Sequence, residues 1–168
     1  MFVFNNINLK KANNIIAKYP KGKSKSAVMP LLWLSQEQDD DNILSKEKIE
    51  YISQFLSLPL IQVYEVASFY TMYNLNDVGK YHIQICGTVP CHLVGSKVIL
   101  DTCKKILGVD KNKITSDGKF SFTEVECLGA CTEGPVVQIN NKQYYEKLNK
   151  KSTAELIFKL SNENKLEN

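Results

Sequence analysis

The sequence predicts an α+β protein, in which an N-terminal helical bundle over residues 1–76 precedes an α/β domain with a mixed sheet over residues 77–168. Apolar side chains recur at helical spacing through residues 1–75. Strand-like alternation begins only after Asp77-Val78-Gly79, and four of the five cysteines then occur in two close pairs. A chain of 168 residues has room for one full domain with a substantial extension.

The first two predicted helices are joined by a break at Pro20 to Lys23. The first helix covers residues 8–18. The second covers residues 27–38, with Ser26 as its cap and Pro30 in its first turn, where the missing N–H costs least. The acidic run Asp39-Asp40-Asp41-Asn42 that follows is interpreted as a solvated loop, because it lacks the spacing of a calcium loop.

Two more helices complete the predicted bundle. Ser45 is placed to cap the third helix, and Leu58-Pro59 begins the fourth. An aromatic stripe like that of the fourth helix is able to hold a flat cofactor, but core packing is the favoured interpretation. The predicted buried faces are Ile49, Ile52, Phe55 and Leu56 in the third helix, and Leu60, Val63, Tyr64, Ala67 and Tyr70 in the fourth.

The second half begins with a strand, a helix and a strand. Residues 81–86 form a strand expected to be half-buried, since three apolar side chains alternate with His82 and Gln84. The second strand covers residues 120–126. The helix between them is expected over residues 95–107, with an inward face made of Ile99, Cys103, Ile106 and Leu107.

A hairpin and a final helix end the predicted domain. The hairpin pairs residues 136–139 with residues 143–145 across an Asn-Asn-Lys turn. The element order β-α-β, hairpin, α is that of a thioredoxin-like half. The polar end, residues 161–168, is expected to fray. The final helix is marked by Thr153, Leu156, Ile157 and Leu160.

The cysteine pairs are the strongest functional signal. Cys86 and Cys91 form a C-x4-C loop, Cys127 and Cys131 form a C-x3-C loop, and each loop follows a strand. A right-handed crossover makes the two strands parallel, so both loops start at the same edge of the sheet. Four thiolates suit a [2Fe–2S] cluster, with one pair on each iron. Glycines that allow close backbone approach to the cluster are expected at Gly87, Gly129 and Gly134.

Other metal and thiol chemistry fits these residues less well. Structural zinc also accepts four thiolates, but it favours C-x2-C knuckles, and a redox dithiol requires C-x-x-C. Cys103 is expected on the apolar face of the helix 95–107, as a small residue of the hydrophobic core. Histidines such as His82 and His92 act as ligands in Rieske-type sites, but with four cysteines present they are interpreted as bystanders. His92, which follows Cys91 in the sequence, is expected to be able to form a hydrogen bond near the cluster.

Composition excludes several classes. All 21 basic residues are lysine and the net charge is +3, which counts against nucleic-acid recognition by arginine forks. Five cysteines without an export signal make a disulfide framework a poor interpretation. No apolar run reaches the length of a membrane span, so no membrane insertion is expected. A cytoplasmic protein docked on something larger is the expectation.

With these residues in hand, the chain resembles the 24 kDa (E) subunit family of respiratory complex I, NADH:quinone oxidoreductase. The resemblance extends over nearly the whole chain. The segments that carry it are Tyr19-Pro20, Ser26-Ala27-Val28-Met29-Pro30-Leu31-Leu32, Ala67-Ser68-Phe69-Tyr70-Thr71-Met72-Tyr73, Gly79-Lys80-Tyr81-His82-Ile83-Gln84-Ile85-Cys86, Glu126-Cys127-Leu128-Gly129-Ala130-Cys131 and Gly134-Pro135-Val136-Val137-Gln138-Ile139.

The resemblance implies a thioredoxin-like [2Fe–2S] domain behind a helical bundle, with Cys86, Cys91, Cys127 and Cys131 as ligands. It implies a partner subunit that binds NADH and FMN and exchanges one electron with this cluster. It also implies that this chain has no catalytic residues of its own and performs no hydride chemistry. Two departures, Val89 and Val94, stand where the family often has threonine and arginine; neither is a ligand.

The resemblance also bears on location and assembly. It implies a position at the cytoplasmic face of the inner membrane through the complex, among other peripheral-arm subunits, or on the matrix side in an organelle. Residues 1–76 are expected to dock on the flavin subunit. One alternative is the diaphorase subunit of an NAD-linked hydrogenase or formate dehydrogenase, and another is a zinc-stabilised binding module without a redox role.

Overall fold

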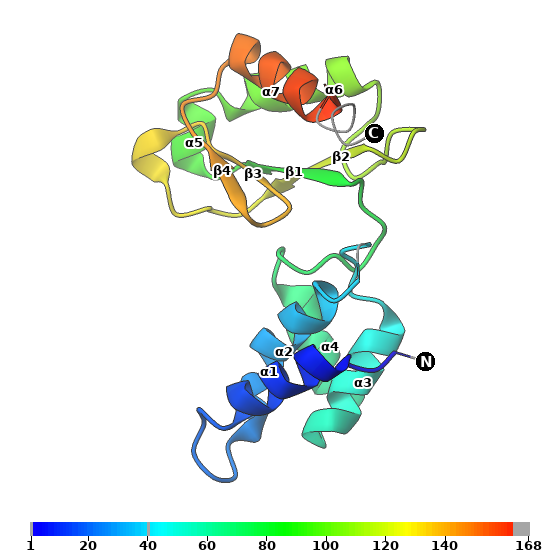
Figure 1. Cartoon of the computed structure of the whole chain (residues 1–168). Coiled ribbons are helices and arrows are strands. Elements are labelled where there is room, and N and C mark those ends of the chain that lie inside the picture. Colours follow the sequence, from blue (N-terminus) through cyan, green and yellow to red (C-terminus); the bar gives the residue numbers. More distant parts are fainter. Residues whose placement is uncertain (1, 40, 163–168) are drawn as a thin grey trace. The chain divides into compact units, whose positions relative to one another are not determined.

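The computed structural model describes residues 2–39 and 41–162. The chain divides into two compact units, Met1–Asp77 and Val78–Asn168, and each is considered by itself (Figure 1). The fraying expected of the C-terminal end falls, for residues 163–168, outside the described residues. None of the described helices is both long enough and apolar enough to cross a lipid bilayer.

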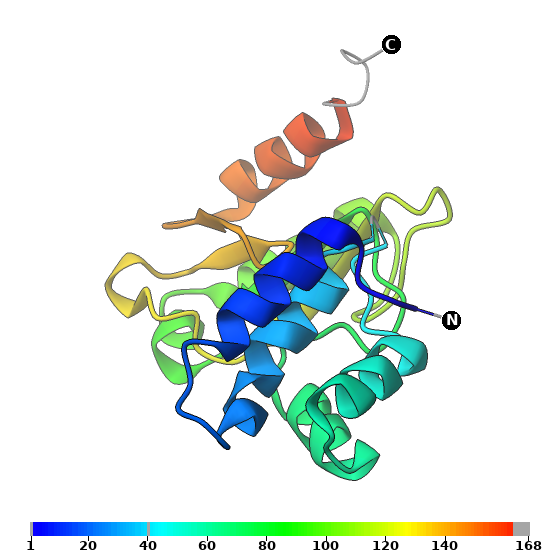
Figure 2. The same cartoon turned by 60° about the horizontal axis from the view of Figure 1, so that its bottom comes forward.

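The first unit is helical, as its apolar periodicity predicts. Helix α1 lies beside helix α2 in both Figure 1 and Figure 2. Fully buried side chains such as Leu31, Leu32, Ile52 and Val63 form its core. The elements are α1 (Asn6–Ile16), a 3-10 turn η1 (Ser24–Ala27), α2 (Val28–Gln36), α3 (Lys46–Leu56) and α4 (Leu60–Phe69).

Helix caps follow the sequence in one case and depart from it in another. The Ser45 hydroxyl accepts a hydrogen bond from the Lys48 backbone N–H at 3.4 Å, which confirms the predicted cap of α3. The prediction that Ser26 caps the second helix is wrong. The η1 turn runs directly into α2, so Ala27 occupies the cap position without a side-chain hydrogen bond.

The acidic run has a structural role that its solvated-loop interpretation missed. The Lys48 side chain is 3% exposed, and its ammonium lies 2.9 Å from an Asp39 carboxylate oxygen and 3.2 Å from an Asp41 carboxylate oxygen. It also donates to the Ile43 carbonyl at 2.7 Å. A buried ammonium requires such partners because its desolvation is costly. The loop is therefore held to α3 by Lys48.

Helix α4 buries a narrower face than its pattern predicts. Val63 and Ala67 are buried, but Leu60, Tyr64 and Tyr70 are 42%, 49% and 39% exposed, so their predicted place in the core is wrong. Within the unit, α4 contacts α2 and α3, and these cover one side of it. A mostly apolar groove lies on the exposed side, lined by Leu44, Lys46, Ile49, Leu60, Ile61, Tyr64 and Leu75.

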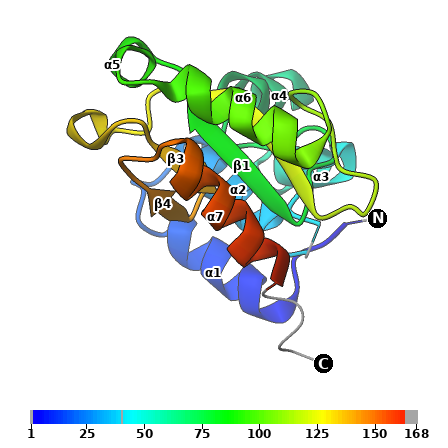
Figure 3. The same cartoon turned by 90° about the horizontal axis from the view of Figure 1, so that it is seen from above.

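The second unit is a four-stranded mixed sheet in the order β2-β1-β3-β4. Strands β1 and β2 are parallel, as predicted, and β3 with β4 forms the predicted hairpin. Helices α6 and α7 cover one face of the sheet (Figures 1 and 3). The elements are β1 (Tyr81–Cys86), α5 (Val89–Leu93), α6 (Ser96–Leu107), β2 (Phe120–Val125), the 3-10 turn η2 (Cys131–Glu133), β3 (Val137–Ile139), β4 (Gln143–Tyr145) and α7 (Lys150–Asn162).

Strand β1 is buried on both faces, which corrects the expectation of a half-buried strand. Its polar side chains find partners within the unit. The His82 ring Nδ1 lies 2.7 Å from the Ser121 hydroxyl on β2, and the Gln84 amide donates to the Asn141 side chain. Hydrogen-bonded polar groups can be buried at little cost. Ile106, predicted to face inward from α6, is 46% exposed.

Candidate metal centre

The two parallel strands bring both cysteine loops to one edge of the sheet. Cys86 is the last residue of β1, and its partner across the ladder is Val125, the last residue of β2. Cys127 follows Val125 by two residues. The Gly87 N–H donates to the Val125 carbonyl at 3.0 Å and fixes the start of the first loop beside the start of the second.

The first loop contains a short helix that the sequence interpretation missed. Helix α5 begins at Val89, has Pro90 in its first turn and carries Cys91. A threonine two residues before a proline is the signal for such a start, with Thr88 in the cap position. Cys86 and Cys91 are each 1% exposed. The first cysteine pair is therefore shielded from water, and Leu128, Ala130 and Val136 pack against it.

The second loop leaves its cysteines at the surface. Cys127 and Cys131 are exposed, and their Sγ atoms lie 3.5 Å apart. Gly129 adopts a φ of +79°, which a glycine accepts without strain, and its N–H points at the Cys127 Sγ atom at 3.4 Å. The Tyr144 hydroxyl donates to the Leu128 carbonyl at 3.2 Å and anchors the loop on β4.

The electrostatics of the thiols connect the two pairs. The pKa of Cys131 is raised by hydrogen bonding with Cys127 and by the charge of Cys127, and additionally by the charge of Cys86 from the other loop. The pKa of Cys91 is raised by burial, then by its contact with Cys86, and also by the charge of Cys131. Each pair therefore lies within electrostatic reach of the other.

Hydrogen-bond donors favour the thiolate at Cys86. Burial alone would raise the pKa of this thiol, but hydrogen bonds from the Thr88 hydroxyl and from the backbone N–H groups of Thr88 and Leu128 bring it below its ordinary value. The Thr88 hydroxyl oxygen lies 3.2 Å from the Cys86 Sγ atom. Thr88 is a contributor to the site that cysteine spacing could not reveal.

Two glycines at the site are explained by close packing. A Cβ atom on Gly134 would lie 2.9 Å from the Val94 Cγ2 atom and 3.4 Å from the Cys91 Sγ atom. A Cβ atom on Gly87 would collide with the Glu124 side chain. Gly134 thus allows the backbone that follows the second cysteine loop to approach Cys91, while Gly87 makes room for Glu124.

The residues fit a [2Fe–2S] cluster in donor chemistry and in grouping. Four thiols are present in two pairs, and backbone N–H groups point at their sulfur atoms. Thiolates are the usual terminal ligands of such clusters, two to each iron. Among the described residues, no three His, Cys, Asp or Glu side chains converge on the position of a single ion.

Packing accounts for the remaining cysteine and for His82, but not for the exposed His92. Cys103 is fully buried in the core under α6, as predicted, and burial raises the pKa of its thiol to about 12. Burial lowers the pKa of His82 to about 4, and its ring is paired with Ser121. His92 lies on the exposed side of α5 beside Cys91.

Thiol pairs at the ends of two adjacent parallel strands of a thioredoxin-like sheet supply the four sulfur donors that the class of iron–sulfur proteins uses for a cluster. Residues 12–161 match the thioredoxin-like [2Fe-2S] ferredoxin family, and the chain belongs to that family. The membership confirms the predicted fold class.

Relatives carry the resemblance further. The chain is 49% identical to the E subunit of NADH-quinone oxidoreductase from Rickettsia conorii over 96% of each chain. It is 48% identical to the protein of the same name from Rickettsia prowazekii, over 96% of this chain and 90% of that one. These relatives confirm the predicted resemblance to the E subunit family.

A solved structure shares the fold. A chain of an NAD+-reducing [NiFe]-hydrogenase in the air-oxidized state superimposes with a TM-score of 0.67 and 19% identity. The match covers 80% of this chain and 23% of the hydrogenase chain. At this identity the likeness concerns the fold alone.

Proposed function

We propose that this chain is an electron-transfer subunit of NADH-quinone oxidoreductase and holds one [2Fe–2S] cluster on Cys86, Cys91, Cys127 and Cys131. The observation that carries the proposal is the parallel register of β1 and β2, which starts both cysteine loops side by side. The 49% identity to an NADH-quinone oxidoreductase chain over nearly the whole length favours this function over a diaphorase subunit of a hydrogenase.

The roles of the four cysteines follow from their loops. Cys86 and Cys91 would hold one iron, and Cys127 and Cys131 the other. When bound, the cluster supplies one-electron transfer. The Thr88 hydroxyl and the N–H groups of Leu128 and Gly129 donate toward sulfur and so stabilise its negative charge. Burial of the first pair excludes water from that side, while the exposed second pair faces outward.

The finer assignment concerns the partner. This chain would exchange one electron with the FMN of a partner subunit that also binds NADH, and the flavin of that partner would perform the hydride chemistry. Residues 1–76 would dock on the flavin subunit, and residues 77–168 would hold the cluster. The complex would keep the chain at the cytoplasmic face of the membrane without insertion of its own.

Anaerobic reconstitution of the full chain with iron and sulfide tests the cluster. The expected product contains two irons and two acid-labile sulfides per chain and gives an EPR signal after one-electron reduction. Native mass spectrometry of the complex tests the partner, and we expect it to detect a flavin-containing protein in contact with this chain. A colourless protein with one zinc and no sulfide would contradict the proposal.

A further inference from the structure

The net positive charge of the chain lies entirely in its first 36 residues. This segment has no acidic residue, whereas residues 37–168 carry fifteen lysines against eighteen acidic residues. The formal charge is therefore +6 before residue 37 and −3 after it, within the +3 of the whole chain. The six lysines of the segment are Lys10, Lys11, Lys18, Lys21, Lys23 and Lys25.

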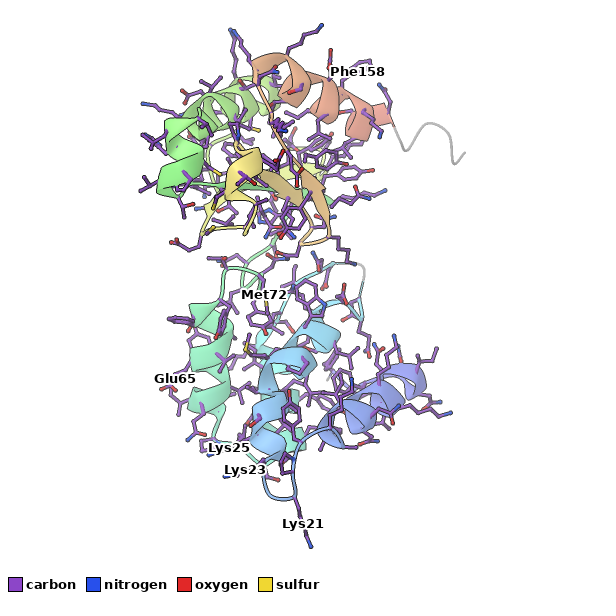
Figure 4. All side chains as sticks on the ribbon, turned by 90° about the vertical axis from the view of Figure 1, so that its left-hand side faces the viewer. Lys21, Lys23, Lys25, Glu65, Met72 and Phe158 are labelled. Atoms are coloured by element: carbon purple, nitrogen blue, oxygen red, sulfur yellow. The ribbon has the colours of Figure 1, made fainter. Side chains whose placement is uncertain are left out.

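Four of these lysines lie on or beside the turn that joins α1 to α2, here called the lysine loop (residues 17–25). The loop is ordered by its own backbone: the Lys23 N–H donates to the Pro20 carbonyl at 2.9 Å, and Gly22 takes a φ of +79°. Tyr19 packs against the core of the unit. Figure 4 shows Lys21, Lys23 and Lys25 at the lower end of the helical unit. The loop thus presents exposed ammonium groups from a fixed support.

The acidic run after α2 does not neutralise the lysine loop. The Gln38 side chain accepts hydrogen bonds from Asn5 and Asn8, which places the end of α2 and the acidic run beside the start of α1. The lysine loop follows the other end of α1, and eleven residues of helix separate the two ends by about 16 Å. Charges at the surface are largely screened beyond about 8 Å at physiological salt.

The six lysines also lack acidic partners within the part of the chain that the structure describes. The ion pairs found among the described residues include none of the six lysines. Among the described residues, the lysine loop is therefore a concentrated positive surface whose ammonium groups take part in no ion pair.

We propose that the lysine loop docks on an acidic surface of a neighbouring protein subunit; this interface rests on the proposed assembly into an oxidoreductase complex. Complementary charge steers association and fixes orientation. Lysine, as a flexible point charge, suits a carboxylate-rich protein surface that does not require bidentate geometry. Among the described residues, none of the exposed large apolar side chains falls in the loop, and a surface that inserts into lipid would carry them.

The test compares two triple variants of the full chain in their binding to the rest of the oxidoreductase complex. K21Q/K23Q/K25Q removes three charges from the lysine loop. K105Q/K113Q/K159Q removes three exposed charges from the second unit and is the matched control. The first measurement is the dissociation constant with which each chain rebinds a complex from which the original chain has been removed, taken at several NaCl concentrations. The second is the EPR signal of each reduced sample.

The lysine-loop variant is expected to bind the stripped complex about tenfold more weakly at low salt, mainly through a slower association rate. The difference should shrink as NaCl rises, and the control should bind like the unchanged chain. Equal binding of both variants would overturn the proposal, as would salt-independent binding of the unchanged chain. A third outcome would favour a lipid surface and overturn the proposal: the unchanged chain binds anionic vesicles, K21Q/K23Q/K25Q does not, and both bind the complex equally. If the chain without substitutions gave no EPR signal after reduction, that result would instead contradict the proposed function.

Discussion

At the scale of single residues, the four paired cysteines have unequal surroundings. Cys86 and Cys91 are buried and receive hydrogen bonds from their own loop and from Leu128 and Val136, whereas Cys127 and Cys131 face the surface. Cys103 shares the burial of the first pair but lies in the apolar core, where burial holds its pKa near 12 and keeps it protonated. A thiol in that state is neither nucleophile nor metal ligand.

Substitution of a paired cysteine should therefore differ sharply from substitution of Cys103. We expect C131S to lose most of the bound iron and sulfide, since one iron would lose a thiolate. C103A should retain the cluster and lose only about 1–2 kcal/mol of unfolding free energy through a small cavity. Iron and sulfide analysis with urea denaturation measures both. Retention of the full cluster by C131S would remove Cys131 from the ligand set.

Gly134 offers a test of close approach at the site. G134A should cost about 1–3 kcal/mol of unfolding free energy, because its Cβ atom meets Val94 at 2.9 Å and Cys91 at 3.4 Å. Shortening the exposed Val94 side chain relieves the nearer of the two contacts. V94A/G134A should therefore recover part of the lost stability, with V94A alone as control. No recovery in urea denaturation would show that the contact with Cys91, or the backbone itself, dominates.

His82 predicts a pH dependence of stability. Burial lowers the pKa of His82 to about 4 in the folded chain, while an unfolded chain binds the proton near pH 6.5. Between these values the unfolded state holds more protons, so the free energy of unfolding falls as pH decreases, by up to about 3 kcal/mol. Below about pH 4 both states are protonated and this contribution is gone. H82Q should flatten the slope between pH 6.5 and 4, measured by urea denaturation; an unchanged slope would assign it to other groups.

At the scale of elements, the strands could be predicted from their alternating apolar residues, but the extent to which each helix is covered by its neighbours could not. The period-two pattern of residues 81–86, and the strand that leads to Cys127, were sufficient to predict the parallel pair and the common edge of both cysteine loops. The five residues of α5 are too short for a helical period to emerge. The periodicity of α4 indicates which residues share a face, but it cannot tell how much of that face a neighbouring helix covers, so Leu60, Tyr64 and Tyr70 were misplaced.

The Lys48 clamp between the acidic run and α3 can be tested by removing either side of it. D39N/D41N leaves a buried ammonium with the Ile43 carbonyl and is expected to cost about 2 kcal/mol of unfolding free energy. K48M removes the ammonium and keeps an apolar stem, while the half-exposed aspartates return to water, so it should cost less than about 1 kcal/mol. Urea denaturation compares them, and a larger cost for K48M would reverse this account.

At the scale of the whole molecule, each unit has a hydrophobic core of its own. The helical unit packs around Leu31, Leu32 and Ile52, and the sheet unit around Ile83, Ile99 and Phe122. All four paired cysteines belong to the second unit. The proposed cluster site and the proposed docking region therefore lie in different units.

A chain that begins at residue 78 should keep the cluster and fail to assemble. The expected result is a full complement of iron and sulfide with an unchanged EPR signal, and loss of co-purification with the flavin subunit. The full chain, expressed under the same conditions, is the control. Normal assembly of the shortened chain would contradict a docking role for residues 1–76.

The ladder between β1 and β2 has a consequence for how the gene can change. Cys86 and Val125 form the last residue pair of the ladder, here called the last rung. The number of residues between Val125 and Cys127 therefore determines how close Cys127 lies to Cys86. An insertion beside Gly108, ahead of the bridge that joins Ile114 to Ser121 of β2, would lengthen a surface excursion and leave the sulfur atoms where they are. The same insertion between Val125 and Cys127 would carry Cys127 away from Cys86. Length variation among descendants of this gene should therefore accumulate far from the rung and be absent next to it.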